Sequence, residues 1–423
     1  MALTVGPLIA LFGFSGLALA VLFGELLESL LLLLRLRVHV GGRLFRDLGQ
    51  PVGAVLFISL IALAVAGLLA TALGAMLTGE TLLQRSLADV AAGGDMHQGS
   101  AFAADRARRG IKVLPLYVDG APLLVTVRRL PFLGLGIAGV SRGPAVPIGA
   151  APEAILRIPE MLRRVALWLR REEGVVEMRV DPWAPESPPL REAWAQAGFS
   201  PCEETFFSRH TMWITATSTP GLSEESLFSQ VNATKRNEIS AARRAGVIVR
   251  RLATPDAAQL SAVAAIVNET AERRGFAPID AAQTLPTWAD LMRAGQMEVW
   301  LAELPDGRVA AAETALRHGE RLTSHHAGSR DFGAEAPVGV VPLLRWTLIN
   351  QARSEGRIAD LGGADIAGHR SIPEPGDRMY GLYTFKRAFG ASWIEMSGAH
   401  RIEVNPIGAR LRGLLRRAAG GAL

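Results

Sequence analysis

MEVWLAELPDGRVAAAETALRH (Met297–His318) decides the fold of this 423-residue chain. Two mostly apolar runs flank Asp306-Gly307, and apolar runs around a D-G turn predict a β-hairpin. A third strand is predicted at Leu322–Ser329, a helix at Val338–Glu355 and a further strand at Ile358–Leu361. Hairpins followed by a strand–helix–strand unit indicate a mixed α/β sheet.

The same outline occurs earlier in the chain, around a second D-G turn at Asp119-Gly120. Its strands and helices are predicted at Val113–Val118, Leu123–Arg128, Leu133–Val140, Pro152–Arg171, Val175–Val180, Leu190–Ala197 and Thr211–Thr217. We therefore predict two similar α/β domains, residues 80–219 and 220–405. Residues 406–423 are predicted to form a basic C-terminal helix.

Residues 1–79 differ in composition from the rest and predict a membrane segment. Met1–Gly24 and Leu48–Gly79 contain no charged side chain, and each is longer than the about 20 residues that a helix needs to cross a bilayer. We interpret Thr4–Leu34 and Pro51–Leu77 as two membrane helices. A secretory signal peptide fits the first run poorly, because that run is too long and opens without a basic residue.

Arginine supplies nearly all of the positive charge. Only Lys112, Lys235 and Lys386 are lysines among 45 basic side chains, which fits either codon bias or positions that need a compact ammonium. The net charge of +5 suits an anionic partner such as RNA, nucleotide or lipid headgroups, although surface arginines alone would also give it. The single cysteine, Cys202, excludes an intramolecular disulfide and a cysteine metal cage. We expect no metal and no cofactor.

Six short stretches carry a pattern along the chain: His97-Gln98-Gly99-Ser100, Ser141–Pro144, Met178–Pro182, Lys235–Gly246, Asp360–Gly363 and Gly381–Gly390. In order and spacing they resemble the FemABX family, the aminoacyl-tRNA-dependent transferases that build peptidoglycan cross-bridges. The resemblance spans roughly residues 80–405 and implies two tandem GNAT-like domains. The helical arm that some members insert is missing, since Asp256–Gly295 has no room for it.

The resemblance implies an aminoacyltransferase that moves an amino acid from aminoacyl-tRNA to an amine of a peptidoglycan precursor (lipid II-like) or another membrane-linked amine. An ester donor is already activated, so the enzyme mainly aligns amine and ester and stabilises the oxyanion. One alternative is a GNAT-type N-acyltransferase that uses acyl-CoA, for which the R/Q-x-x-G-x-G/A loop is missing before Val338–Glu355. The other is a non-catalytic membrane-anchored binding protein of the same fold.

Lys386 is the residue that the resemblance places at the active centre, where it would steady negative charge on the reacting carbonyl or ester. The alternative is a surface lysine beside a core pair of Phe385 and Phe389, which have helical spacing. We predict that Tyr383 and Phe385 bind substrate, with packing alone as the alternative.

Five further residues complete the predicted substrate-binding set. Lys235, Arg236 and Arg243 lie on one predicted helix, and the two arginines share a face because they are two turns apart. A diphosphate or tRNA phosphates would suit that face; a solvated helix surface is the alternative. Arg142 matches the family's first-domain turn, and Asp181 ends a strand, where α/β folds often hold site residues. The alternative for Arg142 is a residue of a strand-ending turn, and the alternative for Asp181 is a cap of the following segment.

Two other features have weaker functional interpretations. His325 and His326 are adjacent on a predicted strand, so their side chains point to opposite faces and do not readily share an ion. We interpret both as structural. Asp360 precedes Gly362-Gly363, where the backbone can approach a ligand closely or simply form a loop.

We expect the protein in the inner (cytoplasmic) membrane with its catalytic domains on the cytoplasmic face. Arg35–Arg46 contains four arginines, which the positive-inside rule places in the cytoplasm. Two full crossings would then put residues 80–423 outside, whereas charged tRNA is cytoplasmic. An exported loop, or a hairpin that enters and leaves on the cytoplasmic face, would reconcile the two arguments.

Overall fold

The computed structural model describes residues 94–129, 135–144, 150–202, 209–252, 254–364 and 371–406, together with Gly408. Both predicted membrane helices and nearly all of the predicted C-terminal helix lie outside these residues. Within the part of the chain that is described, no helix is both long enough and apolar enough to span a bilayer.

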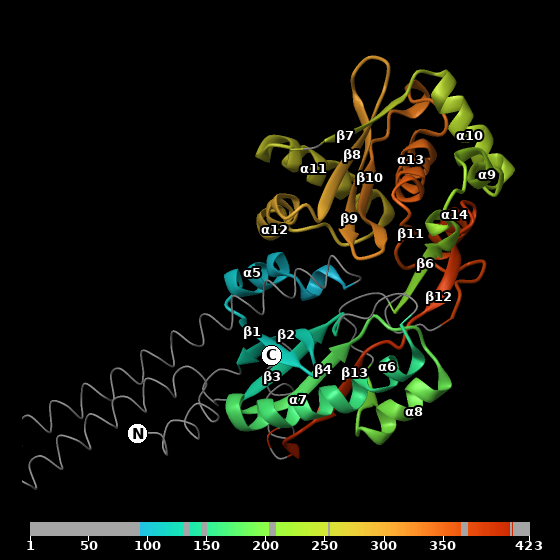
Figure 1. The fold of residues 1–423 in the computed structure, drawn as a ribbon. Helices are drawn as coiled ribbons and strands as arrows, with labels where there is room; N and C mark the ends of the chain where they lie inside the picture. Colours follow the sequence, from blue (N-terminus) through green and yellow to red (C-terminus); the bar gives the residue numbers. More distant parts are fainter. Residues whose placement is uncertain are drawn as a thin grey trace, which may run out of the picture. The chain divides into compact units, whose positions relative to one another are not determined.

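Two mixed β-sheets form the frame of the described chain (Figure 1). The first has the order β1-β2-β3-β4-β13-β5. Its strands are β1 (Lys112–Val118), β2 (Ala121–Arg129), β3 (Gly136–Ser141), β4 (Val175–Asp181), β5 (Ser200–Pro201) and β13 (His400–Glu403). Asp119 and Gly120 turn between β1 and β2 with φ of 50° and 84°, and such positive values suit a two-residue hairpin turn. Helices α6 (Pro152–Leu156) and α7 (Ile158–Glu173) connect β3 to β4, which runs parallel to it.

The second sheet has the order β12-β6-β11-β10-β9-β8-β7. Its strands are β6 (His210–Ile214), β7 (Ile248–Leu252), β8 (Met297–Glu303), β9 (Val309–His318), β10 (Arg321–Ser329), β11 (Ile358–Asp360) and β12 (Ser392–Glu395). Strands β7 to β10 are antiparallel neighbours, and β11 pairs with β10 in parallel. Helix α13 (Val340–Ser354) makes the crossover between those two. The mixed α/β fold predicted from the hairpins is therefore confirmed.

The two sheets follow the same outline, although within the described residues the first has six strands and the second seven, and each contains one strand from the other half of the chain. In the first sheet β13 lies between β4 and β5, and in the second β6 lies between β11 and β12. Strand β6 follows β5 in sequence and β13 follows β12, so the exchange is reciprocal. The sheets therefore do not follow the predicted division at residues 219 and 220. The predicted strand Thr211–Thr217 pairs in the second sheet and ends at Ile214, where a short 3-10 helix begins.

Helices cover the faces of both sheets. Helix α7 packs on the first sheet, whereas α13 covers one face of the second and α11 (Ala257–Arg274) with α12 (Ala281–Arg293) covers the other. Leu162, Ala166 and Leu169 of α7 are each 0% exposed. Their spacing places them on one helix face, and burying a leucine stabilises a fold by about 1.5–3 kcal/mol relative to leaving it exposed.

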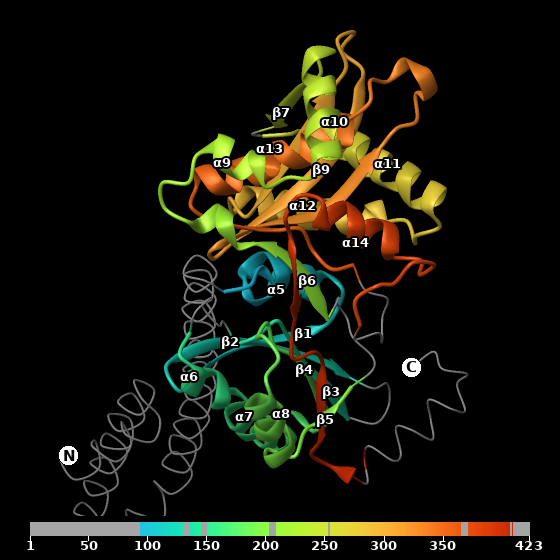
Figure 2. The ribbon, with the colours of Figure 1, turned by 90° about the vertical axis from the view of Figure 1, so that its right-hand side faces the viewer.

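Helix α5 (Ser100–Arg108) was not predicted and lies between the two sheets (Figure 2). It packs on β1 and on α12. The 3-10 helix η1 (Met96–Gln98) precedes it, capped by the Asp95 side chain. Residues 95–108 thereby connect the two sheets, and they bring the polar groups of η1 to the junction.

Candidate active site

The candidate site lies where strands β10 and β11 part. Their parallel pairing covers only three pairs, from Arg321 with Ile358 to Thr323 with Asp360. Beyond it β10 continues to Ser329, while the chain after β11 turns away through Gly362, whose φ is 73°. This left-handed conformation favours glycine.

Lys386 reaches this parting from helix α14 (Tyr380–Arg387). Its Nζ donates hydrogen bonds to the carbonyl oxygens of Gly362 at 3.0 Å and Gly363 at 2.6 Å. The side chain is buried, with 5% of the residue exposed. Lys386 is therefore not a surface lysine, and its ammonium is fixed beside the glycine pair.

Asp360 connects the parting of the strands to a buried charge network. Its carboxylate accepts hydrogen bonds from the hydroxyls of Thr211 and Thr323, and it lies 3.5 Å from Nη1 of Arg321. Gly362 donates its N–H to Asp360 at 2.9 Å. Arg321 is 1% exposed and bonds through Nη2 to Oδ2 of Asp95 at 3.2 Å. One buried guanidinium thus lies between two carboxylates.

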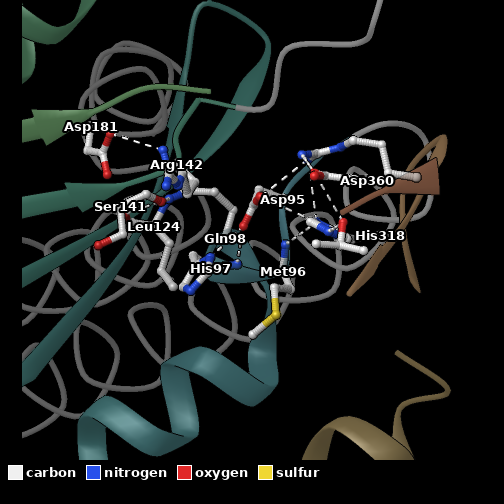
Figure 3. Close-up of polar contacts among 12 residues, drawn as sticks. Asp95, Met96, His97, Gln98, Leu124, Ser141, Arg142, Asp181, His318 and Asp360 are labelled. Atoms are coloured by element: carbon white, nitrogen blue, oxygen red, sulfur yellow. Dashed lines mark hydrogen bonds and ion pairs between the residues drawn. The ribbon is translucent and has the colours of Figure 1, made fainter. Parts of the chain in front are cut away.

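Asp95 is the acceptor for several groups in this network (Figure 3). Its Oδ1 is 2.5 Å from Nδ1 of His97, and its Oδ2 is 3.3 Å from Nδ1 of His318. Burial raises the pKa of Asp95, but the imidazoles of His318 and His97 outweigh it and hold this pKa well below its usual value. The carboxylate is ionised at neutral pH and is held by groups from both β9 and η1.

Arg142 and Asp181 form a buried ion pair on the first sheet, with 3.2 Å between Nη1 and Oδ1. Burial raises the pKa of Asp181 against the opposing charge of Arg142. The ring of Trp183 lies 4.2 Å from the Arg142 guanidinium and 5.0 Å from that of Arg321. These contacts connect the Arg142–Asp181 pair to the network around Asp360, at the junction of the two sheets.

Gln98 holds η1 against the first sheet. Its amide bonds to the backbone N–H of Leu124 at 2.9 Å and the carbonyl of Ser141 at 2.6 Å. A Cβ at Gly143 would lie 2.4 Å from the Gln98 amide carbon, so a larger residue there would displace the Gln98 amide. Figure 3 shows the segment Asp95–Gln98 between the Arg142–Asp181 pair and Asp360. Residues far apart in sequence thus form one polar junction.

The predicted basic helix is α10 (Ala233–Arg244), and its side chains already have intramolecular partners. Lys235 bonds to Glu238 at 2.6 Å and lies 5.6 Å from the Phe385 ring, next to Lys386 in sequence. Arg236 donates to the carbonyls of residues 229 and 231, and Arg243 contacts Glu224 at 3.3 Å. The two arginines share a face, as predicted, and that face lies against α9 (Glu224–Ser229).

Tyr383 and Phe385 pack against aromatic neighbours. Tyr383 is 9% exposed and meets the Trp393 ring edge-on at 5.9 Å, while Phe385 meets Phe389 at 5.2 Å. Their packing positions α14 and hence Lys386; substrate binding by either stays a prediction. No cluster of metal-ligating side chains is present in the described residues.

The residues that sequence reasoning missed are Asp95, His318 and Arg321. Asp95 and Arg321 are 226 positions apart, a separation at which no spacing rule applies. One signal in the sequence could have indicated this network: Arg321 is a charged residue at the start of a strand with few other charges. If that strand is buried, the arginine needs an acidic partner.

Comparisons with known proteins agree with this architecture. The structure of FemX superposes with a TM-score of 0.64 at 16% identity, covering 78% of this chain and 98% of that one. The chain has a FemX-like fold. Residues 229–371 match the acetyltransferase (GNAT) domain family, and the prediction of an acyltransferase is thereby confirmed.

Two other structures align over similar lengths, with lower TM-scores than that of FemX. They are L-PGS from Bacillus licheniformis (13% identity, TM-score 0.42, 77% of this chain and 98% of that one) and a tandem GNAT protein from the clavulanic acid biosynthesis pathway (12%, 0.38, 77% and 96%). No curated protein matches by sequence.

Proposed function

We propose that the protein transfers an amino acid from aminoacyl-tRNA to an amine of a peptidoglycan precursor, lipid II-like, or of another membrane-linked molecule. The observation that carries the proposal is the buried Lys386 ammonium fixed where β10 and β11 part. The FemX-like fold over nearly the full length of FemX supports it.

In this reaction the amine nitrogen bonds to the ester carbonyl carbon of the donor. The bond from that carbon to the ribose oxygen breaks, and the amine's proton passes to the ribose oxygen that leaves. Negative charge develops on the carbonyl oxygen and then on the leaving oxygen. An ammonium placed in advance at that point lowers the barrier, since it needs no reorganisation during the reaction. We assign this role to Lys386.

The buried network gives Lys386 a fixed support. The glycine carbonyls that hold its Nζ belong to Gly362 and Gly363, two and three positions after Asp360. Asp360 is itself held by Arg321, Thr211 and Thr323. Preorganisation of a charged group requires such surrounding contacts. In this proposal Arg142 and Asp181 keep the first sheet in place against this support, and the bilayer and a cytoplasmic-face location bring the site to lipid-linked acceptors.

A second candidate is transfer from acyl-CoA, which the GNAT match over residues 229–371 favours. A cavity of about 220 Å³ also lies at the N-terminus of α13, lined by Ser329, Arg330, Pro337 and Val340 among others. However, a Cβ at Gly339 would lie 1.9 Å from the carbonyl oxygen of Glu238. The Glu238 carbonyl therefore lies close to the N-terminus of α13. A pyrophosphate would have to bind the N–H groups at that same end of the helix, so this contact disfavours acyl-CoA.

A comparison of the two acyl donors in separate incubations distinguishes transfer from aminoacyl-tRNA from transfer from acyl-CoA. The full-length protein is incubated in lipid vesicles containing lipid II with either a total aminoacyl-tRNA pool or acetyl-CoA, and the loss of each acyl donor is followed. The proposal expects discharge of aminoacyl-tRNA that depends on lipid II. Consumption of acetyl-CoA alone would favour the second candidate, and consumption of neither would contradict both.

A further inference from the structure

His325 is an extra residue in strand β10. Along the pairing of β10 with β9, Ser324 lies opposite Ala315 and His326 lies opposite the next residue, Thr314. His325 therefore has no partner on β9, which defines a β-bulge. Bulges re-aim a side chain and are common next to active sites.

The bulge begins where the candidate site begins. A Cβ placed on Gly362 would lie 3.5 Å from the carbonyl oxygen of Ser324 and 3.7 Å from Nζ of Lys386. Ser324 is also the first residue of β10 after its pairing with β11 ends. His325, whose side chain the bulge re-aims, therefore directly follows Ser324, the residue whose carbonyl lies beside Gly362.

The imidazole of His325 is available for chemistry. The side chain is exposed, and within the described residues no group hydrogen-bonds to its ring nitrogens. Its ring contacts the His326 ring at 4.0 Å between centroids. His326 instead packs against Trp288 at 5.7 Å, so the two adjacent histidines have different surroundings.

The charged and titratable neighbours of His325 favour a neutral ring. Although the side chain is exposed to solvent, desolvation by the protein packed around it, first of all, holds the pKa of His325 well below its usual value. The rings of His326 on β10, His97 on η1 and His318 on β9 act in the same direction. The carboxylate of Asp95 acts in the opposite direction. A neutral imidazole at physiological pH is a proton acceptor.

We propose that His325 accepts the proton of the acceptor amine during aminoacyl transfer. The inference rests on the proposed function and adds a catalytic residue to it. As the nitrogen–carbon bond forms, the amine becomes cationic and acidic. Nε2 or Nδ1 of His325 takes its proton and returns it to the ribose oxygen as the ester bond breaks. Lys386 stabilises the negative charge, and His325 moves the proton.

The test compares His325→Ala with His326→Gln in full-length protein in lipid II vesicles, using aminoacyl-tRNA as donor. General base catalysis contributes about 100-fold or more to rate, so His325→Ala should lose about this factor in kcat at unchanged KM. His326→Gln is the matched control and should keep its rate. Unfolding temperatures of both variants are measured to exclude misfolding.

Chemical rescue separates proton transfer from a structural role. Added imidazole should raise the rate of His325→Ala at least about tenfold and leave the wild type unchanged. Absence of rescue, or wild-type kcat in His325→Ala, would overturn the role of His325 while leaving the transfer itself intact. A wild-type protein that makes no aminoacylated product would instead refute the proposed function, and the inference with it.

Discussion

Lys386→Arg keeps the charge of the side chain and changes its shape. In the native site Nζ bonds to two carbonyls at 3.0 and 2.6 Å, in a position where only 5% of the residue is exposed. Gly362 also packs against the ammonium: a Cβ built on this glycine would lie 3.7 Å from Nζ of Lys386. A planar guanidinium is wider than an ammonium and therefore displaces the glycine pair or fails to reach it.

The expected effect is larger on rate than on stability. Losing one hydrogen bond to a charged group costs about 1.5–3 kcal/mol. A misplaced charge also removes stabilisation from the reacting oxygen, and loss of one such donor typically lowers kcat by about 100- to 1,000-fold. We expect kcat to fall by about 100-fold with Tm lowered by a few degrees only.

The assay is the initial rate of aminoacyl transfer at saturating donor, with thermal unfolding measured in parallel. Lys112→Arg is the matched control, since Lys112 forms an ion pair with both carboxylate oxygens of Glu173 at 2.7 and 2.8 Å that an arginine can reproduce. If Lys386→Arg kept activity within about threefold, less than ~1 kcal/mol of barrier, the role assigned to Lys386 would be wrong.

Three further predictions concern charge and topology. Arg236→Gln combined with Arg243→Gln should raise the half-saturating concentration of a phosphate-bearing substrate, with an effect that shrinks at high salt; unchanged binding at low salt would leave both arginines as supports of α9. Asp95→Asn should lower the free energy of unfolding by about 3–5 kcal/mol at pH 7 in denaturant titrations, because Arg321 loses a buried partner. The pKa of Asp95 is lowered by folding, so its contribution is present above the unfolded pKa and is lost as pH falls through the folded value; a difference between variant and wild type that grew on acidification would contradict this. A reporter fused after Leu423 should be active in the cytoplasm, whereas alkaline phosphatase activity without cytoplasmic fluorescence would overturn both the location and the tRNA donor.

Local patterns predicted most elements of the fold, but neither helix α5 nor the exchange of strands between the sheets. The D-G turns and apolar runs placed the hairpins within a few residues. Burial alternates along β13, whereas all of β6 is buried, and neither pattern indicates which sheet buries the strand. The two strands have five and four residues and pair with the other half of the chain, so their partners depend on the assembled tertiary structure.

The candidate site was predictable where a family pattern marked it and not where tertiary contacts made it. Lys386 and its helix followed from the resemblance, and burial of the lysine fits that expectation. The partners of Asp95 lie on β9 and β10, over two hundred residues away, and only folding brings them together. His325 was interpreted as structural because adjacent residues of a regular strand point to opposite faces. The β-bulge at His325 interrupts this alternation, and the sequence did not predict the bulge.

The most direct test of aminoacyl transfer is the chemical identity of the product. Full-length protein in lipid II vesicles is supplied with tRNA charged with a mixture of isotope-labelled amino acids, and the lipid fraction is analysed by mass spectrometry. Our account predicts lipid II that has gained one labelled amino acid in amide linkage, formed by the wild type and strongly reduced in Lys386→Arg. Unmodified lipid II beside intact aminoacyl-tRNA, or a labelled product formed equally well by both proteins, would contradict it.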